Sequence, residues 1–271
     1  MLKKLEKLEN KFKALVSKKE INLIEHNIII GHIHPNDDML FKIDGKYVED
    51  SYLHYNKVGQ SALKNIEDAL EAANIKFSDI KCFLDLPSGY GRVLRVLQTK
   101  IEPNRITACD LNEEAVRFCN SEFGVEPLIS NLDFNKINFN KKYDLIWVGS
   151  LFTHLNPKSF SILLEVLYSI LNDKGILVFT THGEYSLDLI NDKRVYNMEF
   201  PEKEKIIEIL KNEGYYYISN ESSKEYGISI CRTNHIFSEM DKKYNGKLKL
   251  LLYKYRGWDN HQDVYAFQRT V

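Results

Sequence analysis

The sequence contains few cysteines, no long hydrophobic run and no excess of charge of either sign. Only four of its 271 residues are cysteines, and no two of them have the C-x-x-C spacing of many metal and redox sites. We therefore expect small buried cysteines in a reducing compartment. His32 and His34, with Asp37 and Asp38 nearby, superficially suggest a metal site, but without a further ligand none is expected. Residues 1–16 are charged throughout and lack the apolar stretch that a signal peptide or a membrane span requires. This predicts a cytoplasmic protein without a membrane span.

The balance of charge argues against a nucleic-acid partner. The chain has 37 Lys and Arg residues and 38 Asp and Glu residues, which leaves a formal charge of −1 at neutral pH. A protein that binds a phosphate backbone by counterion release usually carries a strong positive field. The 44% hydrophobic content is enough, at this length, to bury the core of one large domain. We therefore expect a globular protein and disfavour a nucleic-acid partner.

The pattern of apolar residues in the first 60 positions differs from that in the rest of the chain. Apolar residues recur at intervals of four and three near the start, which predicts a short amphipathic helix. The residues in question are Met1, Leu5, Leu8, Phe12 and Leu15. Such a helix either packs on its own domain, which two heptads favour, or forms a homodimer. Residues 31–60 show no clear period and predict an irregular segment. Residues 1–60 are thus expected to cover a cofactor or substrate site.

Short apolar runs alternate with helical periods from Lys81 onward, which is typical of a parallel sheet wrapped by helices. Strands are expected at residues 82–86, 105–110, 126–130, 143–149 and 175–181. Helices are expected at residues 61–74, 91–101, 112–122, 157–172 and 202–213. The aromatic, β-branched tail predicts a final antiparallel hairpin. The predicted fold is α/β, a doubly wound, mostly parallel sheet in residues 61–271, with a lid or insertion at about residues 184–250.

A glycine-containing turn follows the first predicted strand. The stretch DLPSGYGRVLRVL places Asp85 on the strand, Gly89 and Gly91 in the turn, and a helix from about Arg92. Glycines let the backbone approach a ligand closely, and a helix start aims free N–H groups at it. Asp110 ends the second strand, roughly 20 residues after the turn, where a carboxylate can accept hydrogen bonds from both ribose hydroxyls. The pattern indicates a ligand that contains a nucleoside.

A dinucleotide is the competing ligand. Its fingerprint requires a third glycine where this chain has Leu94, so NAD and FAD are disfavoured. The segments SNLDF and YDLIWVGSLFTHL follow in order, and they are expected to place Asp133 and Phe134 beside an adenine. The glycine turn, the acid at the end of the second strand and these two segments, in this order, are stronger evidence for a nucleoside ligand than the glycine turn alone.

These segments resemble the successive motifs of the class I S-adenosylmethionine-dependent methyltransferases. The resemblance covers about residues 80–183, through DLPSGYGR, CDLNEEAV, SNLDF, YDLIWVGSLFTHL and LNDKGILVFTTHG. It implies a Rossmann-like sheet of seven strands and an enzyme that uses S-adenosyl-L-methionine and releases S-adenosyl-L-homocysteine. HYNKVGQSAL, GSLFTHL, FTTHG and GWDNHQDVY are similar to one bacterial subgroup of that family, which is associated with surface saccharides and glycoconjugates.

The resemblance also implies roles for individual residues. The turn glycines shape the methionine site, Asp85 orients the amino-acid end, and Asp110 holds the ribose. Asp133 and Phe134 contact the adenine, and the end of the fourth strand lies beneath the sulfonium. The residues expected to bind the cofactor are Tyr55, Asp85, Leu86, Pro87, Ser88, Gly89, Gly91, Arg92, Asp110, Leu111, Asp133, Phe134, Gly149 and Ser150. Tyr55 is either a cover for the cofactor or a packing aromatic, and Pro87 departs from the family pattern by removing a backbone donor.

Methyl transfer to a hydroxyl benefits from a base, whereas an amine acceptor needs only to have lost its proton. Candidate bases should lie at the carboxyl ends of the parallel strands, where open α/β sheets bind ligands. His154, His182 and His261 are the candidates, and His154 ranks first because the fourth strand ends nearest the methyl group. Structural roles remain open for all three: a helix cap, an ordered loop, and a corner anchored by Trp258.

The leading hypothesis is an enzyme that methylates a hydroxyl or amine of a small molecule, a saccharide or a glycoconjugate. Methylation of RNA or protein is disfavoured by the neutral charge and by the lack of an N-P-P-Y type motif. A non-catalytic binding partner with the same fold is the alternative from another class. The sequence leaves open the acceptor atom, the identity of the base and the oligomeric state.

Overall fold

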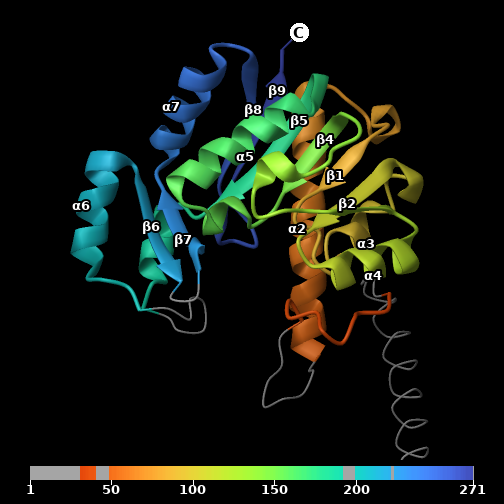
Figure 1. The fold of residues 1–271 in the computed structure, drawn as a ribbon, viewed down its shortest axis with the longest axis horizontal. Helices are drawn as coiled ribbons and strands as arrows, with labels where there is room; N and C mark the ends of the chain where they lie inside the picture. Colours follow the sequence, from red (N-terminus) through yellow and green to blue (C-terminus); the bar gives the residue numbers. More distant parts are fainter. Residues whose placement is uncertain (1–30, 41–48, 192–198, 221–222, 271) are drawn as a thin grey trace, which may run out of the picture.

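A central seven-stranded sheet organises the protein (Figure 1). The computed structural model describes residues 31–40, 49–191, 199–220 and 223–270, so the predicted amino-terminal helix lies outside the described residues. The strand order is β3-β2-β1-β4-β5-β9-β8. The strands are β1 (Phe83–Asp85), β2 (Ile106–Asp110), β3 (Glu126–Ile129), β4 (Tyr143–Val148), β5 (Leu171–Thr181), β8 (Leu248–Trp258) and β9 (Gln262–Arg269).

Strands β1 to β5 run parallel, and β9 pairs antiparallel with both β5 and β8. Consequently β8 points the same way as β5, and the β8–β9 turn lies at the carboxyl edge of the parallel strands. The structure thus confirms the predicted α/β sheet and its terminal antiparallel hairpin. No helix in the described ranges is both long and apolar enough to cross a membrane.

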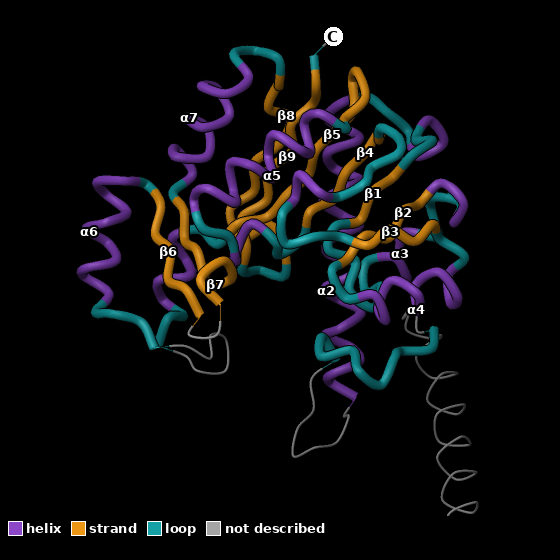
Figure 2. Tube along the Cα trace, viewed as in Figure 1, coloured by secondary structure: helices purple, strands orange, loops and turns teal. Residues whose placement is uncertain are grey.

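Helices cover both faces of the sheet (Figure 2). The α-helices are α2 (Glu49–Ala73), α3 (Leu94–Leu97), α4 (Glu113–Phe123), α5 (Pro157–Ser169), α6 (Lys203–Glu213) and α7 (Thr233–Tyr244). Short 3-10 helices are η1 (Phe77–Asp79), η2 (Pro103–Arg105), η3 (Phe134–Lys136), η4 (Phe152–His154) and η5 (Glu184–Asp188). Side chains of α2, α3 and α4 pack on one face, and those of α5 and α7 pack on the other.

The alternation of side chains along the central strand explains the two cores. On β4, Leu145 and Trp147 join the core beneath α2, α3 and α4, while Ile146 and Val148 join the core beneath α5 and α7. Successive side chains of a strand point to opposite faces, so a parallel strand covered on both sides is apolar at every position. This is why the last four residues of β4, LIWV, are all apolar.

Capping residues set the helix boundaries. The Asn112 side chain accepts hydrogen bonds from Glu114 N and Ala115 N at 3.0 and 3.3 Å, which starts α4. Helix α4 ends at Gly124, whose φ of 68° is left-handed and suits a residue without a Cβ atom. Asn156 caps α5 in the same way, and Pro157 occupies its first turn.

Three predicted boundaries are wrong. The helix expected at residues 157–172 ends at Ser169, and β5 begins at Leu171, within the predicted helix. Helix α2 begins at Glu49, so residues 49–60 are helical rather than irregular. Val58 continues the buried stripe of Ala62 and Ile66 in the core beneath the sheet, and this packing outweighs the polar residues of the first turns. Tyr55 is buried beside Arg92 and Arg95. The helix expected at residues 91–101 is regular only over α3, because Gly91 has a φ of 82° that no α-helix contains.

A smaller unit lies between β5 and β8 in the sequence. It contains η5, α6 and a two-stranded antiparallel sheet of β6 (Tyr215–Asn220) and β7 (Ser223–Cys231). Ile206 and Leu210 of α6 pack on Tyr216 and Ile230 of this sheet in a hydrophobic cluster of their own. Figure 1 shows α6, β6 and β7 beside the main sheet, away from α2, α3 and α4. We call α6, β6 and β7 the appended unit.

The two glycines of the turn after β1 have different surroundings. A Cβ atom on Gly91 would lie 2.4 Å from Cε2 of Phe123, and its φ is 82°. Gly89 is also left-handed, at 50°, but a Cβ atom there would meet nothing within 4 Å. The space beside Gly89 is therefore open, whereas Gly91 is packed against α4.

This difference predicts that Gly91→Ala lowers the free energy of unfolding more than Gly89→Ala does. Both variants place alanine at a left-handed φ, but only the first overpacks the core, which costs roughly 1–3 kcal/mol more. Urea denaturation of the two purified variants measures the difference. Equal losses would contradict the packing argument.

Candidate active site

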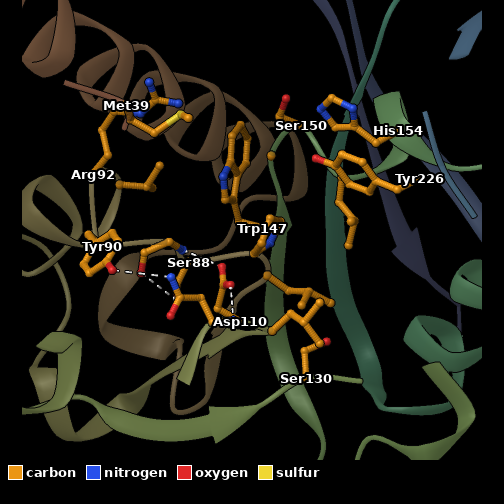
Figure 3. Close-up of a pocket in the computed structure, with 18 of the residues that line it drawn as sticks. Met39, Ser88, Tyr90, Arg92, Asp110, Ser130, Trp147, Ser150, His154 and Tyr226 are labelled. Carbon is orange, nitrogen blue, oxygen red and sulfur yellow. Dashed lines mark hydrogen bonds between the residues drawn. The ribbon is translucent and has the colours of Figure 1, made fainter. Parts of the chain in front are cut away.

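A cavity of about 790 Å³ lies at the carboxyl ends of β1, β2 and β4 (Figure 3). Open α/β sheets bind their ligands at this edge. Eleven of the predicted site residues line the cavity: Leu86, Pro87, Ser88, Gly89, Arg92, Asp110, Leu111, Phe134, Gly149, Ser150 and His154. Six others do not line it: Tyr55, Asp85, Gly91, Asp133, His182 and His261.

The turn after β1 is anchored to the end of β2. Gly89 N donates a hydrogen bond of 2.7 Å to Oδ2 of Asp110, and Ser88 N donates one of 3.0 Å to the carbonyl of Cys109. Asn112 N donates to Oδ1 of Asp110 at 2.9 Å. Each carboxylate oxygen has capacity for a further hydrogen bond, so Asp110 can still accept from a ligand in the cavity.

Asp85 is a buried acid without a partner. Its side chain is 1% exposed, and neither carboxyl oxygen has a hydrogen-bond partner in the described parts of the chain. Burial, and next the negative charge of Asp110, raise the pKa of Asp85 well above its ordinary value, while the charge of Arg92 opposes this rise. A cationic group at this place would remove the cost of burying the carboxylate.

Arg92, like Asp85, has no hydrogen-bond partner in the described chain. Its guanidinium carbon lies 5.9 Å from the ring centre of Tyr55 and 5.6 Å from that of Trp258. Burial lowers the pKa of Arg92. Nearby acidic groups, among them Tyr55 and Asp37, oppose this effect through their charge and not through a hydrogen bond. Because Arg92 lines the cavity, an anionic ligand group can reach it.

Tyr55 is a packed aromatic rather than an exposed cover. It is 3% exposed, and its hydroxyl donates a hydrogen bond of 2.6 Å to Oδ2 of Asp37. Arg95 Nε donates to the same hydroxyl at 3.4 Å. Tyr55 therefore supports Arg92 and Asp37, both of which line the cavity, and does not line it itself.

The end of the cavity formed by β2 and β3 is largely apolar. Phe134 is 8% exposed, and the neighbouring Leu111 and Leu132 are 53% and 64% exposed. Asp133 points elsewhere: its carboxylate caps η3 by accepting from Asn135 N at 3.2 Å. This end can take a flat heteroaromatic ring, but the structure does not bring Asp133 into the cavity wall.

The tip of β4 is held by its neighbours. Ser150 has a left-handed φ of 60°, which is uncommon for a residue other than glycine. Ser150 N donates to Oγ1 of Thr180 at 2.8 Å, and Nε2 of Gln262 donates to Oγ of Ser150 at 3.0 Å. Thr180 in turn donates to Oε1 of Gln262 at 2.6 Å. Strands β5 and β9 thus stabilise the strained residue at the mouth of the cavity.

The three candidate histidines lie in a row, and only His154 lines the cavity. The ring centre of His182 is 6.3 Å from that of His154 and 5.1 Å from that of His261. Burial lowers the pKa of all three, so their neutral forms are favoured. Nδ1 of His154 lies 2.8 Å from the carbonyl of Gly227. A carbonyl only accepts, so Nδ1 carries the proton and Nε2 keeps its lone pair.

Several cavity residues were not predicted as site residues, among them Met39, Tyr90, Trp147 and Tyr226. Trp147 could have been found, because it stands near the carboxyl end of the fourth predicted strand. Tyr226 had no such signal, since it comes from the appended unit. Only the packing of β7 against η4 brings it to the cavity.

Comparison with known proteins agrees with this geometry. Residues 83–175 match the sequence profile of a family described as a methyltransferase domain. A malonyl-[acyl-carrier protein] O-methyltransferase of Calditerrivibrio nitroreducens is 29% identical over 152 residues, which is 56% of this chain and 56% of that protein. The chain thus matches little more than half the length of this relative.

Two solved structures have a similar fold. A S-adenosylmethionine-dependent methyltransferase from Clostridium acetobutylicum is 16% identical, with a TM-score of 0.53 over 78% of this chain and 92% of the other. A protein from Pyrococcus horikoshii is 14% identical, with a TM-score of 0.53 over 78% and 91%. Residues 83–175 thus match a methyltransferase-domain profile, and the chain has the Rossmann-like fold of these two structures.

Proposed function

We propose that this protein transfers the methyl group of S-adenosylmethionine to a hydroxyl group of a small molecule or saccharide. The observation that carries the choice of a hydroxyl is His154, a neutral imidazole that lines the cavity with Nδ1 bonded to a carbonyl. An amine remains the second acceptor class, because an amine that has lost its proton needs no base. The partial match to an O-methyltransferase supports an oxygen acceptor.

The residues around the cavity suit each part of the cofactor. Asp110 would hold the ribose hydroxyls, and Phe134 with Leu111 would contact the adenine. Arg92, which lines the cavity, would bind the carboxylate of the methionine end. Asp85, a buried acid whose oxygens have no hydrogen-bond partner in the described chain, would become charged next to the ammonium. The cofactor supplies an activated methyl group on sulfur, so the protein needs mainly to align the acceptor and remove its proton.

His154 would remove that proton. As the acceptor oxygen forms its bond to the methyl carbon and the carbon–sulfur bond breaks, the hydroxyl proton passes to Nε2 of His154. The products are a methyl ether, S-adenosylhomocysteine and an imidazolium that later returns its proton to water. The similarity of FTTHG and GWDNHQDVY to the bacterial subgroup supports a saccharide or glycoconjugate acceptor.

The cofactor site is tested by Asp110→Ala. Loss of two hydrogen bonds to a charged acceptor is expected to weaken S-adenosylmethionine binding at least about 100-fold in calorimetry. Glu113→Ala, an exposed acid three residues away on α4, is the matched control and should bind normally. Near-normal affinity in a folded Asp110→Ala protein would refute the ribose assignment, and no binding by the wild-type protein would refute the function.

The methionine end is tested by Arg92→Gln. We expect this change to weaken S-adenosylmethionine binding about 10-fold to 100-fold, because a charge-assisted hydrogen bond is lost. Binding of decarboxylated S-adenosylmethionine, which lacks only the carboxylate, should be unchanged. Arg117→Gln on the exposed face of α4 is the control. Equal weakening of both ligands would show that Arg92 does not contact the carboxylate.

The base is tested by His154→Asn. Asparagine can still donate to the carbonyl of Gly227 but has no basic nitrogen, so kcat is expected to fall about 10²-fold to 10⁴-fold with cofactor affinity retained. Because burial lowers the pKa of His154, wild-type kcat/KM should fall only as the pH drops below about 6.5. The acceptor is first identified by tritiated-methyl labelling of a cell extract. An unchanged rate would exclude His154 as the base.

A further inference from the structure

Strand β7 of the appended unit runs alongside the candidate base. Leu155, which follows His154, forms an isolated antiparallel bridge with Tyr226 of β7. Ser229 Oγ donates a hydrogen bond of 2.8 Å to the carbonyl of Phe152 in η4. The strand is therefore joined to the loop that carries His154 at two places, although it belongs to a unit with its own hydrophobic cluster.

Two consecutive residues of β7 contact the imidazole of His154. The ring of Tyr226 stacks on it, with ring centres 4.6 Å apart and planes 11° apart. The carbonyl of Gly227 lies 2.8 Å from Nδ1. One contact covers a face of the ring and the other determines which nitrogen carries the proton. Figure 3 shows His154 and Tyr226 side by side at the edge of the cavity.

The carbonyl of Ser229, two residues further along β7, contacts Nδ1 of His182 as the carbonyl of Gly227 contacts Nδ1 of His154. Residues two apart on a strand point the same way, so Gly227 and Ser229 present their carbonyls in one direction. The carbonyl of Ser229 lies 3.1 Å from Nδ1 of His182, and Cys231 N donates to the carbonyl of His182 at 2.9 Å. A single strand thus holds both imidazoles through Nδ1.

Gly227 can approach this closely because it has no side chain. A Cβ atom on Gly227 would lie 2.0 Å from the carbonyl oxygen of Ile218 on β6. The hairpin therefore requires glycine at the position whose carbonyl meets His154. Tyr226 beside it is 46% exposed, which is high for an aromatic residue whose ring stacks on another.

We propose that Tyr226 and Gly227 are positioning residues for methyl transfer, and that the base acts only when β7 is docked against η4. This rests on the proposed function of His154. The appended unit then contributes to catalysis itself, because it excludes water from one face of the imidazole and keeps the proton on Nδ1. Tyr226 touches the base, and the base touches the acceptor.

The groups that face His154 define the test. Tyr226 and the carbonyl of Gly227 face it from β7, and His182 faces it from the end of β5. Burial is the main reason that the pKa of His154 is lowered, and the Gly227 carbonyl acts in the opposite direction. Removing the Tyr226 ring should expose the imidazole and raise its pKa toward the ordinary value.

The experiment is an NMR titration of His154 in the full chain saturated with S-adenosylhomocysteine. Tyr226→Thr should raise the titration midpoint of His154 by about 0.5 pH unit or more and mix the two tautomers seen in the ¹⁵N shifts. Tyr226→Phe keeps the ring and should match the wild type. Tyr255→Thr, a 57% exposed tyrosine on β8, is the matched control.

Coincident titration curves and tautomers for wild type and Tyr226→Thr would overturn the proposal. If Tyr226→Thr does not fold, the same titration is carried out on Ser229→Ala. This variant lacks the hydrogen bond between β7 and η4, and the titration midpoint of His154 should rise as in Tyr226→Thr. With an acceptor, Tyr226→Thr should lower kcat about 10-fold. Full activity of His154→Asn would instead refute the proposed base, whatever Tyr226 does.

Discussion

The hydrogen bond from the backbone of Gly89 to the carboxylate of Asp110 joins the two loops on which the cavity depends. It spans 2.7 Å and connects the turn after β1 to the end of β2. Parallel strands bring these loops to one edge of the sheet, but neighbouring loops are otherwise free to diverge. With the turn tied down, the open side of Gly89 and the remaining lone pairs of Asp110 face one space.

Charge is distributed unevenly around that space. Asp85 and Arg92 lie on either side of the turn, and neither has a hydrogen-bonding partner in the described chain. Burial favours the neutral form of Asp85, so a cationic ligand group beside it would favour its carboxylate, while an anionic group could pair with Arg92. The amino-acid end of S-adenosylmethionine carries one group of each charge. The remaining wall near His154, formed by Leu151 and Leu155, is apolar.

The histidines connect the main sheet to the appended unit. His154 and His182 follow β4 and β5, and both are held through Nδ1 by carbonyls of β7. A change in the docking of this strand would alter the proton positions on both rings at once. The unit that lies between β5 and β8 in the sequence is therefore placed to influence the chemistry as well as access to the cavity.

The order of the strands along the chain, the glycine turn and the acid at the end of β2 could all be predicted from the amino-acid sequence. Each of these depends on local geometry: apolar runs of strand length, glycine at a left-handed φ, and a carboxylate at a strand end. The start of α2 was missed because its first turns are largely polar, and only the burial of Val58 in the core beneath the sheet makes the stripe recognisable.

Which of the predicted residues line the cavity, and which side chains contact one another, follows only from the three-dimensional packing. It placed His154 in the cavity wall and His182 and His261 behind it, although all three follow strands in the same way. It also brought Tyr226 and Gly227 to His154 from more than 70 residues away in the sequence. No local pattern encodes this contact, because it arises from the packing of β7 against η4, and that packing depends on side chains far apart along the chain.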